Sequence, residues 1–177
     1  PVVSTGARPE EGAPEAGKAR VEFYGQAMVD AIYDAKRMNP DYAATLRPSQ
    51  IPVNCPGDAG CGEDGAATFS VRQSSLGFRA FIPTGIGVLK TDLSFDLFAS
   101  DGSTNIHWLS AWAELGMFGI GQTYSNFMDI DVFPNTIDYW GPSGMVFVRN
   151  PQLRITPWSK DGASLAFALE APNSALD

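Results

Sequence analysis

Few side chains in this sequence are arranged as a catalytic site would require. Asp92 and Asp96 alternate with Lys90 in one short stretch and could mimic an acid–base pair. Paired carboxylates that act as acid and base need a controlled spacing and a shielded environment, which a wet strand face does not provide. Ser110 and Ser164 lack a G-x-S-x-G motif and a partner histidine, and His107 is the only histidine. We therefore expect no enzyme activity, no cofactor and no metal.

Two cysteines, Cys55 and Cys61, lie in the turn-rich segment NCPGDAGCG. A disulfide that closes such a short loop is plausible in an oxidising compartment. A metal site would need about four ligands, and there is no histidine nearby to supply the missing ones. Free thiols are the remaining alternative. We expect a disulfide between these two residues.

Much of the chain alternates between apolar and polar side chains. From Val21 to Arg37 the odd positions are apolar or small, and most of the even positions are polar. An alternation with period two is typical of a β-strand with two different faces. This stretch is far longer than an ordinary strand of about 5–6 residues.

Similar alternation continues along the chain and predicts about seven strands, each paired antiparallel with its neighbour. In the second strand the phase changes, which predicts a β-bulge near Gln73. Short turns follow the second, fourth and sixth strands, and long connections follow the first and fifth. The later strands are expected at residues 67–82, 88–100, 106–115, 118–127, 145–158 and 164–170.

Composition narrows the class of protein. The chain has 177 residues and a formal net charge of −8, which argues against a nucleic-acid partner. It has no apolar run near the ~20 residues that a transmembrane helix needs. Residues 1–20 are rich in proline and glycine and show no periodicity, so we interpret them as a flexible leader. The folded part is expected to be residues 21–177.

Two all-β architectures fit this pattern. A soluble sandwich or small barrel, acting as a ligand-binding module, would bury its apolar face in a core. A transmembrane barrel would turn that face to lipid, with short turns at one end and long loops at the other. Long strands suit a membrane crossing, which takes about 9–11 residues. Small residues fill a core poorly but are acceptable against acyl chains; those on the apolar face are Gly25, Ala27, Ala31, Ala111 and Ala113.

Longer segments resemble a known family. GQTYSNFMDIDVFPNTIDYWGPSG and FVRNPQLRITPW are similar to trimeric outer-membrane porins, most of all the DcaP-like family of Gram-negative bacteria. VEFYGQAMVDAIYD resembles that family's first barrel strand, and SVRQSSLGFRA resembles its second. The resemblance implies a barrel of about 16 strands around an aqueous channel, assembly as homotrimers in the outer membrane, and diffusion of small anions, including dicarboxylates. With about seven strands, this chain should form an incomplete, open half-barrel.

The resemblance also implies which residues act on the solute. A third loop, about residues 128–144, would fold inward and narrow the channel, and basic side chains on the wall would receive carboxylates. An arginine facing lipid at mid-membrane would cost roughly 2–4 kcal/mol, which favours inward orientation. Arg149 and Arg154 could share a face only if a bulge lay at Pro151 between them. The loop residues are Asp129, Asp131, Asn135, Asp138 and Tyr139, and the wall residues are Arg72, Arg79, Lys90, Arg149 and Arg154.

Overall fold

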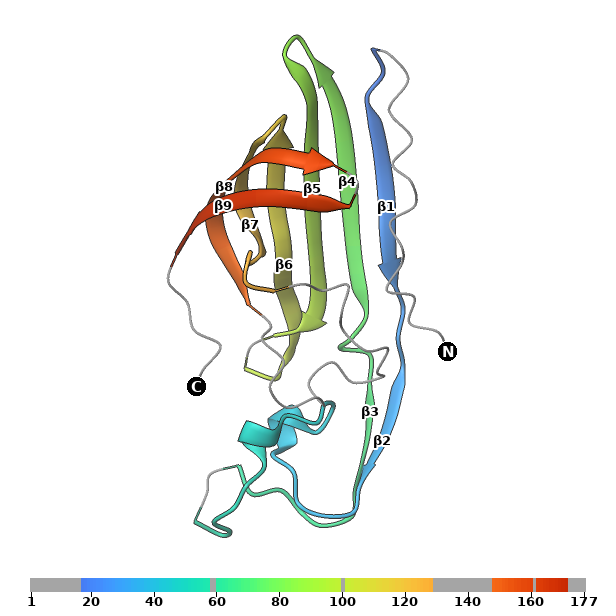
Figure 1. The fold of residues 1–177 in the computed structure, drawn as a ribbon. Coiled ribbons are helices and arrows are strands. Elements are labelled where there is room, and N and C mark those ends of the chain that lie inside the picture. Colours follow the sequence, from blue (N-terminus) through green and yellow to red (C-terminus); the bar gives the residue numbers. More distant parts are fainter. Residues whose placement is uncertain (1–16, 58–59, 100, 129–147, 161, 172–177) are drawn as a thin grey trace.

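The computed structural model describes residues 17–57, 60–99, 101–128, 148–160 and 162–171, and most of them lie in antiparallel strands (Figure 1). Two short 3₁₀ turns, η1 (Pro40–Tyr42) and η2 (Pro48–Gln50), lie in the first long connection. No helix among these residues has the length and apolar character needed to cross a bilayer. The strands are β1 (Arg20–Gln26), β2 (Asp30–Asp34), β3 (Ala66–Ser70), β4 (Ser75–Thr84), β5 (Gly87–Phe98), β6 (Thr104–Leu115), β7 (Phe118–Tyr124), β8 (Arg149–Lys160) and β9 (Ala163–Glu170).

Seven of these strands form one sheet in the order β1-β4-β5-β6-β7-β8-β9. Every neighbouring pair is antiparallel, as the alternation predicted. The sheet is open, because the two edge strands β1 and β9 do not pair with each other. Figure 1 shows the sheet curling strongly, so that β8 and β9 pass in front of the earlier strands. This is the architecture expected of part of a barrel. The predicted leader lies mostly outside the described residues.

The first two predicted strands are each interrupted. Their distal halves, β2 and β3, form a separate two-stranded ribbon. Between the sheet and the ribbon, residues 27–29 stand opposite residues 71–74, so one side has an extra residue. That extra residue is the phase change seen in the sequence, and it lies where the bulge near Gln73 was predicted. The chain makes a turn there, in which Ser74 N donates to the Val71 carbonyl at 2.9 Å. The Ser74 hydroxyl bonds to both the N–H and the carbonyl of Met28, in place of the missing strand pairing.

The two faces of the sheet differ in polarity. Side chains such as Val21, Phe23 and Leu153 are exposed, while Ser94, Ser110 and Gln152 on the opposite face are buried. Side chains on the inside of a curved sheet crowd together and shield one another, so we place the polar set on the concave face. Among the described residues, the only buried apolar side chains are those of Met38, Ala44 and Phe81. A soluble sandwich needs an apolar core, so the described part of the chain does not fit that alternative.

The first long connection, residues 35–65, folds into a compact unit. Met38, Ala44 and Thr45 are buried within it. The predicted disulfide between Cys55 and Cys61 is present, with a Cα–Cα distance of 5.9 Å. The connection therefore has three buried side chains and a disulfide that closes one of its loops.

This unit is braced against the neighbouring connection between β5 and β6. Arg72 donates from Nη1 to the Asp41 carbonyl at 3.1 Å and from Nε to Thr104 Oγ1 at 3.0 Å. Gly102 packs directly against the same Asp41 carbonyl. Hydrogen bonds from the side chain and the backbone N–H of Ser103 lower the pKa of Asp101 in this connection. The two connections therefore support each other at one end of the sheet.

Candidate pore wall

The register of the strands brings polar side chains into rows across the concave face. Each row takes one residue from each strand of the sheet, and neighbours in a row stand directly opposite each other in adjacent strands. Both rows contain charges of both signs. The first row is Glu22, Arg79, Asp92, Trp112, Gly121, Gln152 and Glu170, and the second is Arg20, Phe81, Lys90, Glu114, Gly119, Arg154 and Ala168.

Arg79 lies in a tightly bonded cluster. Its Nε is 2.8 Å from Asp92 Oδ2. The Tyr24 hydroxyl donates to both oxygens of that carboxylate, at 3.0 and 2.9 Å. The Arg79 guanidinium also lies 4.4 Å from the centre of the Tyr24 ring, and Gly77 leaves room for that ring. Much of the positive charge of Arg79 is therefore offset by its carboxylate partner.

Arg154 has a different environment. Its Nε and Nη2 lie 3.1 and 2.9 Å from Gln152 Oε1, and Nη2 also donates to the Tyr124 carbonyl at 2.7 Å. The guanidinium lies 5.2 Å from the centre of the Trp112 ring, which packs over Gly119. These partners carry no formal charge, although guanidinium over an aromatic face is itself a favourable contact. Arg154 is therefore fixed in place by uncharged groups, while the carboxylates of Glu114 and Glu170 interact with its charge without a direct hydrogen bond among the described contacts.

The remaining predicted basic residues do not all join this wall. Lys90 lies on the same face, directly opposite Glu114. Arg72 lies in the turn before β4, where its described hydrogen bonds go to Asp41 and Thr104. The structure thus places Arg79, Lys90 and Arg154 on one face and separates Arg72 from them.

Arg149 is also separated from Arg154. The pairing of β7 with β8 runs from Arg149 to Ile155 without a shift, so the predicted bulge at Pro151 is absent. Pro151 cannot donate, but its carbonyl still accepts from Ala171 N at 2.9 Å, and the strand keeps its register. By alternation, Arg149 lies on the opposite face from Arg154. It donates to the Tyr124 hydroxyl at 3.2 Å.

Several residues of the wall were not recognised from the sequence. Glu170 accepts from Asn126 N at 2.9 Å and from Asn150 Nδ2 at 3.0 Å, so it joins β9 and β8 to the residues that follow β7. Its position was readable in principle, because Leu165, Phe167 and Leu169 alternate with it. Tyr24, Trp112 and Gln152 were missed because their roles depend on which strands pair.

Only some of the other residues singled out in the sequence can be placed in the structure. The constriction-loop residues Asp129, Asp131, Asn135, Asp138 and Tyr139 lie outside the described residues. His107 lies beside Asp96, with Nδ1 3.1 Å from Oδ1. Across the described part of the chain, no group of three or more His, Cys, Asp or Glu side chains could hold a metal ion.

Comparisons with known proteins agree with this geometry. Residues 9–174 match the model of the DcaP outer membrane protein family. The outer membrane channel DcaP of Acinetobacter baumannii has a similar fold, with a TM-score of 0.68 and 20% identity over 90% of this chain and 43% of that one. This chain therefore spans less than half of the solved channel's length. None of the curated proteins matches it.

The geometry of the sheet is consistent with these comparisons. The sheet is open, has an exposed apolar face and has a polar face that carries rows of charge. The matching family is one of outer-membrane proteins. With the family model matching nearly its whole length, this chain belongs to the DcaP outer membrane protein family.

Proposed function

We propose that this chain forms one side of a water-filled porin channel for small anionic solutes, dicarboxylates in particular. The observation that carries this proposal is the state of Arg154, a basic side chain on the polar face whose described hydrogen-bond partners are all uncharged. Guanidinium groups bind carboxylates through two parallel hydrogen bonds. Lys90, opposite Glu114, and Arg79, whose charge is partly offset by Asp92, are the other basic side chains on that face.

Closure of the barrel is part of the proposal. Two open strand edges in hydrocarbon would leave backbone groups without partners, at several kcal/mol each. Further strands must therefore connect β9 back to β1 in the complete protein. That the solved channel is more than twice as long as the matched part supports this. The concave polar face would then line the lumen, and the apolar face would meet lipid.

The third loop, about residues 128–144, is the second part of the proposed selectivity mechanism. We infer that Asp129, Asp131 and Asp138 face the basic wall across the narrowest point, which would create a transverse field. The net charge of −8 need not describe the lumen, because many of the acidic residues belong to the leader and the loops of the sequence. We also propose that the complete protein assembles as a homotrimer, as the resemblance implies.

The test measures ion selectivity of the complete protein in planar lipid bilayers. In a salt gradient, we expect a reversal potential that shows anion preference, and block by added dicarboxylates. Replacing Arg154 with alanine should reduce both effects more than replacing Arg79, because Asp92 already offsets much of the Arg79 charge.

Arg72→Ala is the matched control, since that side chain is engaged in the turn before β4. It should leave selectivity unchanged. Cation preference in the unmodified channel would overturn the proposal. So would a double variant, R79A with R154A, that keeps both the anion preference and the dicarboxylate block.

A further inference from the structure

The chain does not continue in line with β7 after that strand ends. The backbone N–H of Asn126, just past the end of β7, donates to Glu170 Oε1 at 2.9 Å. Glu170 is the last residue of β9, and β8 lies between β7 and β9. Neighbouring strands are about 4.8 Å apart, so roughly 10 Å separates β7 from β9. A backbone atom in line with β7 would be out of reach of a glutamate side chain on β9, so the segment after β7 must cross over β8.

This crossing lies on the polar, concave face of the sheet. Glu170 stands opposite Gln152, which is buried on that face. Gln152 reaches the end of β7 from the same side, because its Nε2 donates to the carbonyls of Thr123 and Tyr124 at 3.3 and 2.9 Å. Arg154, on the same face of β8, donates to the Tyr124 carbonyl at 2.7 Å. Side chains of the concave face therefore hold both the end of β7 and the residues that follow it.

Both oxygens of the Glu170 carboxylate accept hydrogen bonds. Oε2 accepts from Asn150 Nδ2 at 3.0 Å, while Oε1 accepts from Asn126 N. Asn150 is only 5% exposed, so its amide is a firm support for the carboxylate. Ser125 is also buried, and its N–H donates to the Val148 carbonyl at 3.1 Å. Hydrogen bonds to an ionised acceptor are roughly twice as strong as those between neutral groups, so Glu170 is a strong anchor for the crossing segment.

A second carboxylate on the same face provides a comparison. Glu114 lies opposite Lys90, and both Glu114 and Glu170 act electrostatically on Arg154. The two glutamates therefore make similar contributions to the charge of the wall. They differ in their hydrogen bonds, because among the contacts of the described residues only Glu170 bonds to the segment after β7. A role of Glu170 in placing the chain can thus be separated from its role as a negative charge.

We propose that Glu170 is a positioning residue that sets the width of the channel. It holds Ser125, Asn126 and Phe127 across the concave face, where their backbone takes up part of the space inside the curve of the sheet. Loss of the carboxylate would release this segment and widen the passage. The inference rests on the proposed channel, and it concerns the width of the passage and not its preference for anions.

The experiment measures the width of the complete protein's channel with neutral polymers, which do not respond to the charge of the wall. Polyethylene glycols of graded size are added to planar bilayers, and those that enter the channel lower its conductance. Glu170→Ala should admit larger polymers than the unmodified channel, whereas the matched control Glu114→Ala should not. Hydrogen exchange at the Asn126 amide should be several-fold faster in Glu170→Ala and unchanged in Glu114→Ala.

A second variant, Asn150→Asp, keeps the size of the side chain and changes the charge of the wall in the opposite direction. Its carboxylate would repel Glu170 from the crossing segment, so we expect this channel to admit larger polymers too. An unchanged polymer limit or unchanged Asn126 exchange in both Glu170→Ala and Asn150→Asp would overturn the inference. An equal increase in Glu114→Ala would also overturn it. Reversal potentials of the same channels test the proposed anion preference separately, because that preference can fail while the effect on width remains.

Discussion

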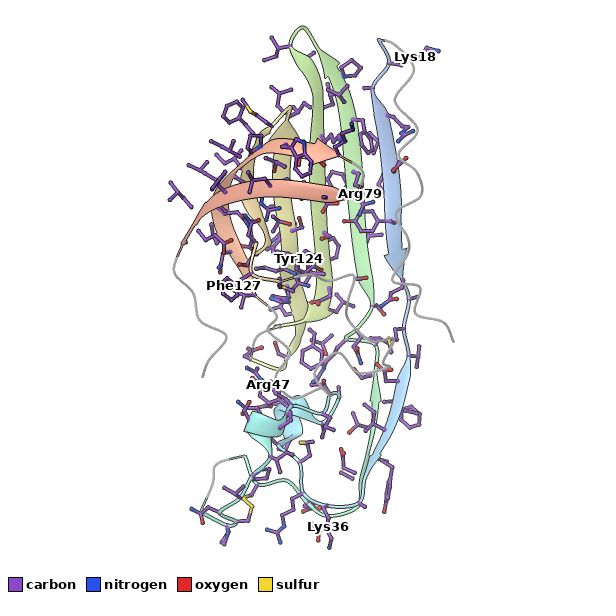
Figure 2. All side chains as sticks on the ribbon, viewed as in Figure 1. Lys18, Lys36, Arg47, Arg79, Tyr124 and Phe127 are labelled. Atoms are coloured by element: carbon purple, nitrogen blue, oxygen red, sulfur yellow. A yellow bond between two sulfur atoms is a disulfide. The ribbon has the colours of Figure 1, made fainter. Side chains whose placement is uncertain are left out.

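Arg79 and Arg154 carry the same charge but differ in how it is balanced. Arg79 lies 2.8 Å from a carboxylate, which also accepts two contacts from Tyr24. Arg154 is held by an amide, a backbone carbonyl and an indole ring. In Figure 2, Arg79 lies on β4 in the direction of β1. The charge available to a passing solute therefore depends on the neighbours of an arginine as much as on its presence.

Asp92→Asn tests this difference. The substitution removes the negative partner of Arg79, so we expect the reversal potential of the complete channel to shift toward stronger anion preference. We also expect a loss of roughly 1–3 kcal/mol in stability, because Tyr24 and Arg79 lose their charged acceptor. Planar-bilayer recordings and urea unfolding would measure the two effects. Asp64→Asn, in the first long connection, serves as the control, and an equal shift in both variants would contradict the assignment.

For single residues, the sequence predicted which face of a strand a side chain occupies better than it predicted which side chains lie together. Alternation correctly put Arg79, Lys90 and Arg154 on a polar face. It could not place Arg72, because the turn that removes this residue from the sheet depends on contacts with Asp41 and Thr104. Arg149 was expected on the same face as Arg154 because Pro151 was taken to cause a bulge. The strand keeps its register at Pro151, whose carbonyl accepts a hydrogen bond from Ala171 N.

Among the elements, the first long connection is held by its disulfide and by the contacts that the Asp41 carbonyl makes with Arg72 and Gly102. Gly102 adopts φ +80° and packs against the Asp41 carbonyl, while Gly162 adopts φ +79° with open space around it. The two glycines share a backbone conformation and differ in what a side chain would meet. They form a matched pair for testing the brace.

Alanine at either position should cost roughly 1–2 kcal/mol from the left-handed backbone alone. Only Gly102→Ala would also push the η1 segment away from the β5–β6 connection. We expect faster hydrogen exchange at the Tyr42 and Thr45 amides in that variant, because their hydrogen bonds lie in η1 and its following turn. Unchanged exchange in Gly102→Ala, or an equal increase in Gly162→Ala, would mean that the contact does not brace the connection.

Sequence periodicity predicted the strands well and their interruptions poorly. The positions and order of the seven paired segments followed from alternation and turn residues. The separation of the ribbon did not, because it depends on a serine side chain that replaces backbone pairing at Met28. In the first predicted strand the alternation continues across that break, and only the phase change near Gln73 in the second predicted strand marks it.

For the whole molecule, the open sheet is the dominant feature. We expect the 177-residue chain alone to give no uniform conductance steps in planar bilayers, because β1 and β9 leave two edges without partners. Co-refolding with the separately expressed remainder of the complete protein should produce such steps. Uniform channels from the chain alone would show that the sheet closes without further strands.

The scarcity of buried apolar side chains bears on how far such a sequence can diverge. In most proteins a packed core restricts substitution, because each side chain must fit the shape of its neighbours. Here, within the described residues, most of the large apolar side chains point outward, where fluid acyl chains adapt to any shape. One apolar residue can therefore replace another at those positions without a compensating change elsewhere. A fold governed in this way can persist with a TM-score of 0.68 while only 20% of the residues remain identical.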